Sequence, residues 1–543
     1  MFALKEFFSR NHPVIACESP VSELQRFFLE VVNYCKVTDT QAFLWNLNFH
    51  KIKKLAKNCD GKLVIEDFNS YRPSVKQNKE DYFEVFNFWK DYQGTGILII
   101  ENVYPWLKES EAQDTDLFLV SQWLKSAIAN LELNRSKGKT TMLLGPSAEI
   151  TGELGSIVPL WVQELPDTSE IIDNLISSNF FPTLKPGDLE PIAIASVGLY
   201  VADIISCLQA IKIDFPAFEP SNLASLMLSK KTQLLKRLYD CEFVLPSSVE
   251  LGGLELMQES FKRFKALLAP RAKEYNLRVP KGILLVGPPG TGKSHSAKAC
   301  SQNMNIPLIM VDWGNFRSFG NLAEVKLKRL LALADRLNQV ILYFDDFDKS
   351  FAGDDPLAKR LAGQLLTWMQ ERQSDVLVMA SVNRMEWLPP ELTRAGRFDY
   401  LFKIDLPNEG ERHHIFKIHA SRFDKRFANG GDPWSDQQWR RILKETKRCV
   451  GSEIQTIVER AAASIFATMT IAEDNDNNLK NFPLILSVEA ILEERRQIKP
   501  LAIREADRVE SMRNKADAQA LPSSPIDDSK FAVGDLDIFN STV

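Results

Sequence analysis

The sequence lacks the features that mark membrane and exported proteins. No apolar run approaches the roughly 18 residues that a spanning helix needs, and residues 1–6 lack the basic start of a secretory signal, as well as its apolar core and small-residue cleavage site. We therefore expect no membrane span, and we expect the protein to stay in the compartment where it is made.

Cysteine is scarce, and the sequence has no excess of positive charge. The seven cysteines are odd in number, widely spaced and without any CxxC pair. This pattern argues against a disulfide framework or a zinc site and indicates reduced core residues. The net charge of −5, without basic residues interleaved with aromatic ones, offers no general attraction to polyphosphate. We therefore expect no nucleic-acid partner.

The length predicts several domains. A chain of 543 residues is too long for one hydrophobic core, and its hydrophobic content of 45% and charged content of 25% are typical of globular proteins. We expect about three to five units of domain or subdomain size.

A glycine-rich segment in the second half matches the phosphate-loop pattern GxxxxGK[ST] in full. It follows an apolar run at residues 282–286 that predicts a buried strand, and it comprises Gly287, Pro288, Pro289, Gly290, Thr291, Gly292, Lys293 and Ser294. In such a loop the backbone N–H groups surround the β-phosphate, the lysine neutralises the β and γ oxygens, and the serine hydroxyl binds Mg²⁺. The loop therefore predicts a nucleoside triphosphate and Mg²⁺ as ligands.

Two acids end a later apolar run. Residues 340–344 predict a buried strand, and Asp345 and Asp346 follow it directly. Because the carboxyl ends of parallel strands share one edge of a sheet, these acids should lie beside the phosphate loop. We interpret Asp345, with Ser294, as the metal-side residue and Asp346 as the base for the attacking water.

Polar residues after the next strand complete the predicted site. Residues 375–382 form another apolar run and deliver Asn383 to the same edge, where its amide would orient the attacking water. Arg394 and Arg397 follow, and their guanidinium groups would spread over transition-state charge as arginine fingers. A salt bridge within the fold is the alternative for the two arginines.

The first half is also predicted to be α/β, with a doubly wound sheet. Its first expected strand, at residues 13–16, is followed by Cys17, Glu18, Ser19 and Pro20, which offer no glycine and present a carboxylate to any phosphate. We interpret residues 1–185 as a degenerate, RecA-like P-loop-type domain without a phosphate loop, which should not hydrolyse nucleotide.

The remaining boundaries follow from periodicity and turn residues. Helical patterns predict a lid of the first domain at residues 186–246, and a turn-rich junction precedes a second α/β core at residues 247–410. Helical periodicity over residues 411–510 predicts a second lid. Residues 511–543, rich in Ala, Ser, Pro and Asp, are interpreted as a disordered tail.

The second half resembles the classical AAA clade of the AAA+ ATPases. The resemblance is carried by GPPGTGKS at 287–294, ILYFDDFD at 341–348, VLVMASVNR at 376–384 and LPPELTRAGRFDYLFKIDLP at 388–407. Within the clade the chain is similar to the plastid and cyanobacterial family first named as hypothetical chloroplast open reading frame forty-six. Supporting features are LTWMQE at 366–371, GSEIQ at 451–455 and the α/β half without a phosphate loop.

The resemblance implies an ATPase that works as a ring, of six copies by analogy, in which Arg394 and Arg397 reach the ATP of a neighbouring copy. It also implies that Gly451, in the lid, contributes to nucleotide binding. It places a substrate-gripping loop at residues 315–320, where Phe316 or Phe319 would either hold a protein chain or serve as core residues. The implied location is a cyanobacterial cytoplasm or a plastid stroma.

Asp346 departs from the family pattern, because most AAA proteins carry glutamate at this position. Aspartate is one methylene shorter, so turnover could fall on the order of a hundredfold. Two readings follow. In the first, the protein hydrolyses ATP to remodel a protein partner. In the second, it is a slow or non-hydrolysing, nucleotide-gated interaction protein. A nucleic-acid motor is a weaker third reading.

Overall fold

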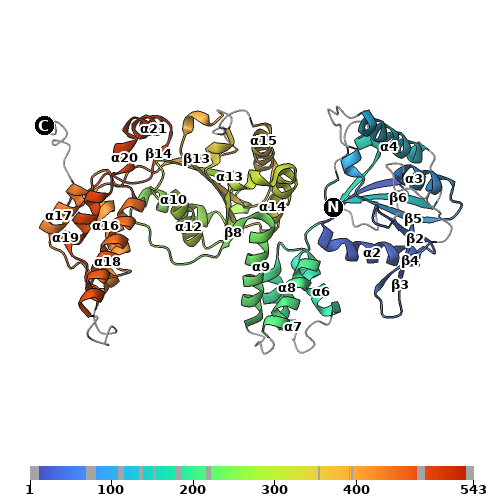
Figure 1. The fold of residues 1–543 in the computed structure, drawn as a ribbon, viewed down its shortest axis with the longest axis horizontal. Helices are drawn as coiled ribbons and strands as arrows, with labels where there is room; N and C mark the ends of the chain where they lie inside the picture. Colours follow the sequence, from blue (N-terminus) through green and yellow to red (C-terminus); the bar gives the residue numbers. More distant parts are fainter. Residues whose placement is uncertain are drawn as a thin grey trace. The chain divides into compact units, whose positions relative to one another are not determined.

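The computed structural model describes residues 12–49, 51–68, 81–107, 115–133, 138–148, 150, 154–178, 186–215, 222–351, 355–389, 392, 396–473 and 483–532. The chain divides into two compact units, Met1–Lys230 and Lys231–Val543. Each unit holds its own seven-stranded sheet (Figure 1).

The sheet of the first unit has the order β4-β3-β2-β5-β6-β1-β7. The pairs formed by β2, β5, β6, β1 and β7 are parallel, whereas β3 and β4 form an antiparallel hairpin that extends one edge. The strands are β1 (Val14–Glu18), β2 (Gln41–Trp45), β3 (Lys53–Lys57), β4 (Leu63–Asp67), β5 (Gly96–Glu101), β6 (Lys139–Gly145) and β7 (Leu160–Val162). The α/β interpretation of this half is confirmed.

Helices cover both faces of this sheet (Figure 1). Alternate strand residues point to opposite faces. On one face Leu98 and Leu143 pack with residues of α3 (Asp81–Asp91) and α4 (Thr115–Leu133). On the other, Ile99 and Met142 pack with α2 (Leu24–Val37). The central strands are therefore buried on both sides, which explains their continuous apolar runs.

A helical group follows the first sheet. It consists of α6 (Thr168–Ser178), α7 (Pro186–Ser196) and α8 (Val201–Asp214), after the single turn α5 (Leu154–Ile157). The next helix, α9 (Leu223–Tyr239), spans the division between the two units. The group thus begins before the predicted boundary at residue 186. Among the described residues no single helix is long and apolar enough to cross a membrane; only the sharply bent pair Asp188–Ser196 and Val201–Asp214 reaches that threshold jointly.

The sheet of the second unit has the order β14-β13-β9-β12-β11-β10-β8. All its neighbouring strands are parallel except β8, which runs antiparallel to β10. The strands are β8 (Cys241–Val244), β9 (Gly282–Val286), β10 (Leu308–Asp312), β11 (Ile341–Asp345), β12 (Leu377–Val382), β13 (Tyr400–Lys403) and β14 (Leu521–Pro522). Because β8 belongs here, the predicted boundary at residue 246 lies several residues too late.

The second sheet also lies between helices (Figure 1). Residues of α10 (Glu255–Ala266) and α12 (Lys293–Met304) pack with Leu285 and Tyr343 on one face. On the other face Trp313 contacts Phe344, which points opposite to Tyr343. The remaining helices of the core are α11 (Pro270–Glu274), α13 (Trp313–Phe316), α14 (Ala323–Leu337) and α15 (Pro356–Glu371).

A helical lid follows this core, as predicted. Its members are α16 (Glu409–Ala420), α17 (Asp436–Glu445), α18 (Gly451–Glu473) and α19 (Val488–Gln497). They enclose an apolar core that includes Phe416, Trp439, Ile454 and Ile491. Helix α16 begins with a capping box, in which Asn408 and Glu411 satisfy each other's backbone N–H groups. The second half therefore has the parallel-sheet core and helical lid that its sequence predicts.

The prediction of a disordered tail is wrong for residues 511–532. Helix α20 (Leu501–Arg504) leads to α21 (Ala506–Gln519), and β14 adds a parallel strand to β13. Asp527 then accepts a hydrogen bond from the backbone of Gly410, and Phe531 is buried in the lid core. The composition of this segment resembles a disordered one, but contacts with distant residues order it. Residues 533–543 of the predicted tail lie outside the described residues.

The cysteines follow the prediction with one exception. All seven are free, and six are buried. Cys59 is exposed, between β3 and β4. The prediction of core positions is therefore confirmed for six cysteines and wrong for Cys59, which is free but exposed.

Candidate functional site

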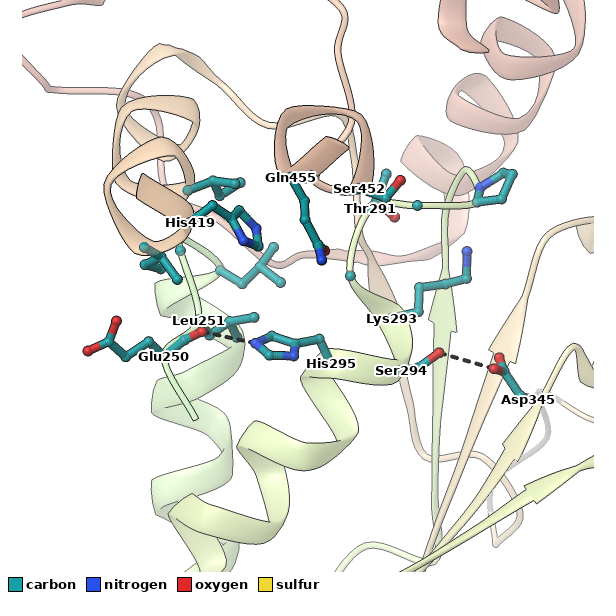
Figure 2. A pocket seen from close by; sticks show the side chains of 18 of the residues that line it. Glu250, Leu251, Thr291, Lys293, Ser294, His295, Asp345, His419, Ser452 and Gln455 are labelled. Atoms are coloured by element: carbon teal, nitrogen blue, oxygen red, sulfur yellow. Dashed lines mark hydrogen bonds between the residues drawn. The ribbon is translucent and has the colours of Figure 1, made fainter. Parts of the chain in front are cut away.

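A cleft of about 430 Å³ lies at the carboxyl edge of the second sheet. Four parts of the chain line it: the segment before α10, the loop between β9 and α12, the ends of β11 and β12, and the lid helices α16 and α18. Figure 2 shows Lys293 and Ser294 at the start of α12, with His419 and Gln455 facing them from the lid.

The glycine-rich loop has the shape that a phosphate cradle needs. Gly290 has a φ of +84°, and a Cβ atom there would lie 2.3 Å from the Ser452 hydroxyl oxygen. A Cβ atom on Gly287 would lie 2.0 Å from the backbone oxygen of Ile404. Both positions therefore require glycine. The backbone N–H of Ser452 also donates to the oxygen of Gly290 at 3.1 Å, which joins the lid to the loop.

Lys293 is the buried cation of the cleft and is only 6% exposed. Its Nζ donates to the backbone oxygens of Gly287 and Pro288, at 2.8 and 2.9 Å, and to Asn383 Oδ1 at 2.8 Å. Among the described residues no carboxylate lies within ion-pair distance of it. Burial lowers the pKa of Lys293 to about 8, against the opposing effect of nearby aspartates. A buried ammonium with neutral partners is suited to receive an anionic ligand.

Ser294 and Asp345 meet as predicted. The Ser294 hydroxyl donates to Asp345 Oδ2 at 3.1 Å, as Figure 2 shows. Two further hydroxyls hold the other carboxylate oxygen, those of Tyr343 at 3.0 Å and Ser381 at 2.5 Å. Burial raises the pKa of the Tyr343 phenol, so it remains a donor. The result is a fixed group of oxygen ligands beside the phosphate loop.

Asp346 and Asn383 also meet. Asn383 donates from Nδ2 to Asp346 Oδ1 at 2.5 Å while its Oδ1 accepts from Lys293. Lys349, one turn further on, pairs with Asp346 Oδ2 at 2.6 Å. Asp346 itself has a left-handed backbone, with φ of +51°. Both oxygens of this carboxylate are therefore engaged by other side chains.

The far wall of the cleft comes from the lid. Ile415, Ile418 and His419 of α16 face the segment at residues 250–254. His419 Nδ1 is buried without a hydrogen-bond partner among the described residues. Burial, together with Arg422, lowers the pKa of His419 to about 4, so the ring is neutral at pH 7. Opposite it, His295 Nε2 lies 2.9 Å from the backbone oxygen of Glu250 (Figure 2).

The structure brings most predicted site residues together. The cleft is lined by residues 289–294 and by Asp345, Asp346, Asn383 and Gly451. Gly287 and Pro288 contact Lys293 through their backbone oxygens. Arg397 is half-buried and is not among the lining residues. Arg394 lies outside the described residues. Phe316 is 1% exposed and stacks on Trp313, so it serves as a core residue.

Sequence reasoning missed several residues of the site. Tyr343 and Ser381 lie inside apolar strands, so their hydroxyls gave no signal until the fold placed them beside Asp345. The lid residues had a detectable signal, since Ile415 and His419 stand four positions apart on one helix face. Lys349 could have been noticed three residues after Asp346.

The residues present fit Mg·ATP. The cradle has no room for side chains at Gly287 and Gly290. Lys293 lacks an anionic partner among the described residues. The oxygens of Ser294 and Asp345 are the hard ligands that Mg²⁺ prefers. The unpartnered nitrogen of His419 offers a polar contact on the opposite wall.

A phosphate loop at the carboxyl edge of a parallel sheet, closed by a helical lid, defines the nucleotide-binding module of an AAA protein. The sequence profile of this family, the ATPase family associated with various cellular activities, matches residues 283–406. The ATP-dependent zinc metalloprotease FtsH of Thermus thermophilus is 30% identical over 226 residues, which cover 39% of this chain and 35% of that relative.

A more specific relationship extends over both units. An uncharacterized AAA domain-containing protein ycf46 of Guillardia theta is 30% identical over 419 residues, or 75% of this chain and 78% of the relative. The ycf46 protein of Trieres chinensis is 30% identical over 353 residues, which cover 63% and 69% of the two chains. The chain belongs to the ycf46 family of AAA domain-containing proteins. The resemblance stated from the sequence is confirmed.

Proposed function

We propose that the protein hydrolyses ATP to ADP and phosphate in the cleft of the second unit. The observation that carries the proposal is the geometry around Lys293: a buried ammonium held by the loop and by Asn383, one residue from a serine bonded to Asp345. ATP phosphates would replace the neutral partners of this ammonium. Bound Mg²⁺ would neutralise phosphate charge, with Ser294 and Asp345 as its candidate holders.

Asp346 and Asn383 would perform the chemistry on water. The Asp346 carboxylate would accept a proton from the attacking water, and the Asn383 amide, already 2.5 Å from that carboxylate, would orient the water. Asp348 supports this edge, since its Oδ1 accepts the backbone N–H of Asn383 at 3.2 Å. Arg394 and Arg397 would act from a neighbouring copy, because Arg397 does not line the cleft of its own chain.

We further propose that the active form is a homo-oligomeric ring, of six copies by family resemblance, that remodels a protein partner. The support is the direct bond between the lid and the loop: Ser452 touches Gly290, so phosphate release would be transmitted to the lid helices. The proposed location is a cyanobacterial cytoplasm or a plastid stroma, where other family members would be expected.

A second candidate is a slow, nucleotide-gated interaction protein. It is favoured by Asp346, whose carboxylate is one methylene shorter than the usual glutamate and is engaged by both Asn383 and Lys349. This arrangement supports nucleotide binding more strongly than fast turnover.

The test is ATP binding and phosphate release by the Lys293→Ala protein. We expect both to be lost. The matched control is Lys298→Ala, which removes a lysine from the same helix but outside the cleft and should bind and release normally. Unchanged phosphate release in Lys293→Ala would refute the proposal. Binding with no turnover in the unaltered protein would favour the second candidate.

A further inference from the structure

A second cavity, of about 360 Å³, lies in the first unit. It sits between α3 and α4, over the start of β1 and β6. Strands of a parallel sheet begin at the edge opposite to the one where phosphate loops lie. The cavity therefore lies at the opposite end of β1 from the loop at residues 19–20, where this type of sheet carries a phosphate loop.

The floor of the cavity carries a buried hydroxyl. Thr141 lies on the same face of β6 as Leu143, whose neighbours on α3 and α4 fill the layer above it. Thr141 lies two residues before Leu143, and at this level of the sheet the space between α3 and α4 is the cavity. Thr141 is 1% exposed, and its Oγ1 has no hydrogen-bond partner among the described residues. Such a group is costly to bury unless something else satisfies it.

Aromatic rings form the walls. Phe86 and Trp89 of α3 are buried, and Trp123 of α4 is half-buried and faces the same space. Trp123 is the least buried of these three rings, and its ring favours a planar ligand, because aromatic faces stack with offset geometry. The volume is near the lower end of the usual range for small-molecule sites, which limits the ligand to one or two fused rings.

The charge on the wall comes from Lys139. Its Nζ donates to the backbone oxygens of Trp89 at 2.9 Å and Lys90 at 3.4 Å, at the end of α3. An ammonium has three N–H donors, so one remains for a ligand. Nζ also lies 5.5 Å from the Trp89 ring and 5.7 Å from the Tyr92 ring. This cation already occupies the place over the rings where a cationic ligand would bind, and it would repel one.

We infer that this cavity binds a small planar aromatic acid, with its ring against Trp123, its acidic group on Lys139 and a polar ring atom directed toward Thr141. The charged residues of the lining are Lys90, Asp91 and Lys139, so the two lysines outnumber the one acid and the lining carries a net positive charge. The site is independent of the ATP cleft, because all its residues belong to the first unit.

The test uses three probes that share one ring and differ in charge. Indole-3-acetate, indole-3-acetamide and tryptamine are titrated into the full-length protein by calorimetry. We expect measurable affinity for the acetate, about tenfold weaker affinity for the amide, and none for tryptamine. Lys139→Gln should abolish the preference for the acetate, and Thr141→Val should weaken binding about fivefold.

The matched control is Thr140→Val. It removes the neighbouring hydroxyl, which points to the opposite face and donates to the His12 backbone oxygen. This variant should bind like the unaltered protein. Thr141→Val should unfold at an unchanged or higher temperature, because it removes an unsatisfied group, so its loss of binding cannot be attributed to misfolding. The inference is overturned if no probe binds at millimolar concentration, if tryptamine binds best, or if Thr141→Val and Lys139→Gln both bind normally.

Discussion

Five neighbouring parallel strands have the same order in the two sheets, but the sheets differ at the edge that holds the candidate nucleotide site. In the first unit these strands run β2-β5-β6-β1-β7, and in the second β10-β11-β12-β9-β13. The correspondence extends to backbone detail. Asn102 follows β5 with φ of +60°, and Asp346 follows β11 with φ of +51°. The same framework has been built twice in one chain.

The loops after the central strands differ. Gly287 follows β9 and opens a glycine-rich cradle, whereas Ser19 follows β1 at the equivalent place. In the first unit the nearby carboxylates are used internally. Glu18 accepts the backbone N–H of Ala148 at 3.3 Å, and the buried Glu23 accepts that of Ala202 at 2.7 Å.

Tyr104 fills the space at the end of the central strands of the first sheet. Its hydroxyl accepts the backbone N–H of Cys17 at 2.9 Å and donates to the oxygen of Leu143. A Cβ atom on Gly145 would lie 2.7 Å from the Tyr104 ring, so the ring sits directly on the strand end. The comparison teaches that strand order alone does not make a nucleotide site. The loop and the charges at the strand ends do.

The largest effect should come from the arginine assigned to a neighbouring copy. In the proposed arrangement, the second unit of one copy binds ATP and Arg397 of the next copy completes the site. The Arg397→Ala protein should then bind ATP normally, but its turnover should fall about a thousandfold. Phosphate release is measured over a range of protein concentrations, and binding by calorimetry. Turnover per chain that is independent of concentration and survives the substitution would place the whole site in one chain.

Asp346→Glu should have the next largest effect. The added methylene would return the carboxylate to the usual distance from the water, and turnover should rise about tenfold to a hundredfold. The control is Asn102→Asp, which places an acid at the equivalent position of the first sheet and should leave turnover unchanged. A rise caused by Asn102→Asp would break the comparison, because the first sheet would then be catalytic.

Sequence reasoning worked where chemistry is local. Asp345 is the last residue of an apolar strand, and the phosphate loop, Asp346 and Asn383 each follow such a strand directly. The parallel sheet brings these strand ends to one edge. It also recognised that the first loop, at Cys17 to Pro20, lacks glycine. These features depend on residues that are neighbours in the sequence, so they can be predicted without tertiary contacts.

It failed where distant residues decide the structure. The segment at 511–532 is polar and proline-containing, yet Arg513 pairs with Asp405 at 2.7 Å and Ser524 donates to Glu411 at 2.5 Å. The partners lie more than 100 positions away in the sequence. Strand β3 was missed for a related reason: it is rich in lysine and only Leu55 is buried. No periodic apolar pattern marks such elements.

Exchanging the first residue of each loop tests the comparison through stability. Gly287→Ser would place a side chain where a Cβ atom already lies 2.0 Å from the Ile404 oxygen, and it should destabilise the second unit by about 2 kcal/mol or more. Ser19→Gly should cost the first unit less than about 1 kcal/mol, chiefly through backbone entropy. Chemical unfolding of the two variants gives the difference. Equal losses would mean that the two loops are under the same steric constraint.

The smallest expected effect is a proton taken up when ATP binds. Burial lowers the pKa of Lys293 to about 8 from its ordinary value of 10.5, so near pH 8 about half the free sites hold a neutral lysine. Phosphate oxygens would restore the charge, and binding at pH 8 should take up about half a proton. Calorimetry in two buffers of different ionisation enthalpy measures it.

The same pKa shift predicts the stability of the protein without nucleotide. Between pH 8 and 10.5 the unfolded chain holds more protons at Lys293 than the folded chain does, so the free energy of unfolding should rise with pH in that window. Below pH 8 the cost of the buried charge is present in full. Lys298→Ala, outside the cleft, should show both the proton uptake and the rise, whereas the loop of the first unit at Ser19 and Pro20, which carries no lysine, should contribute neither. If the heat of ATP binding at pH 8 does not depend on the buffer, Lys293 is already fully charged in the free protein. The difference in charge between the two loops would then have a smaller effect than their sequences suggest.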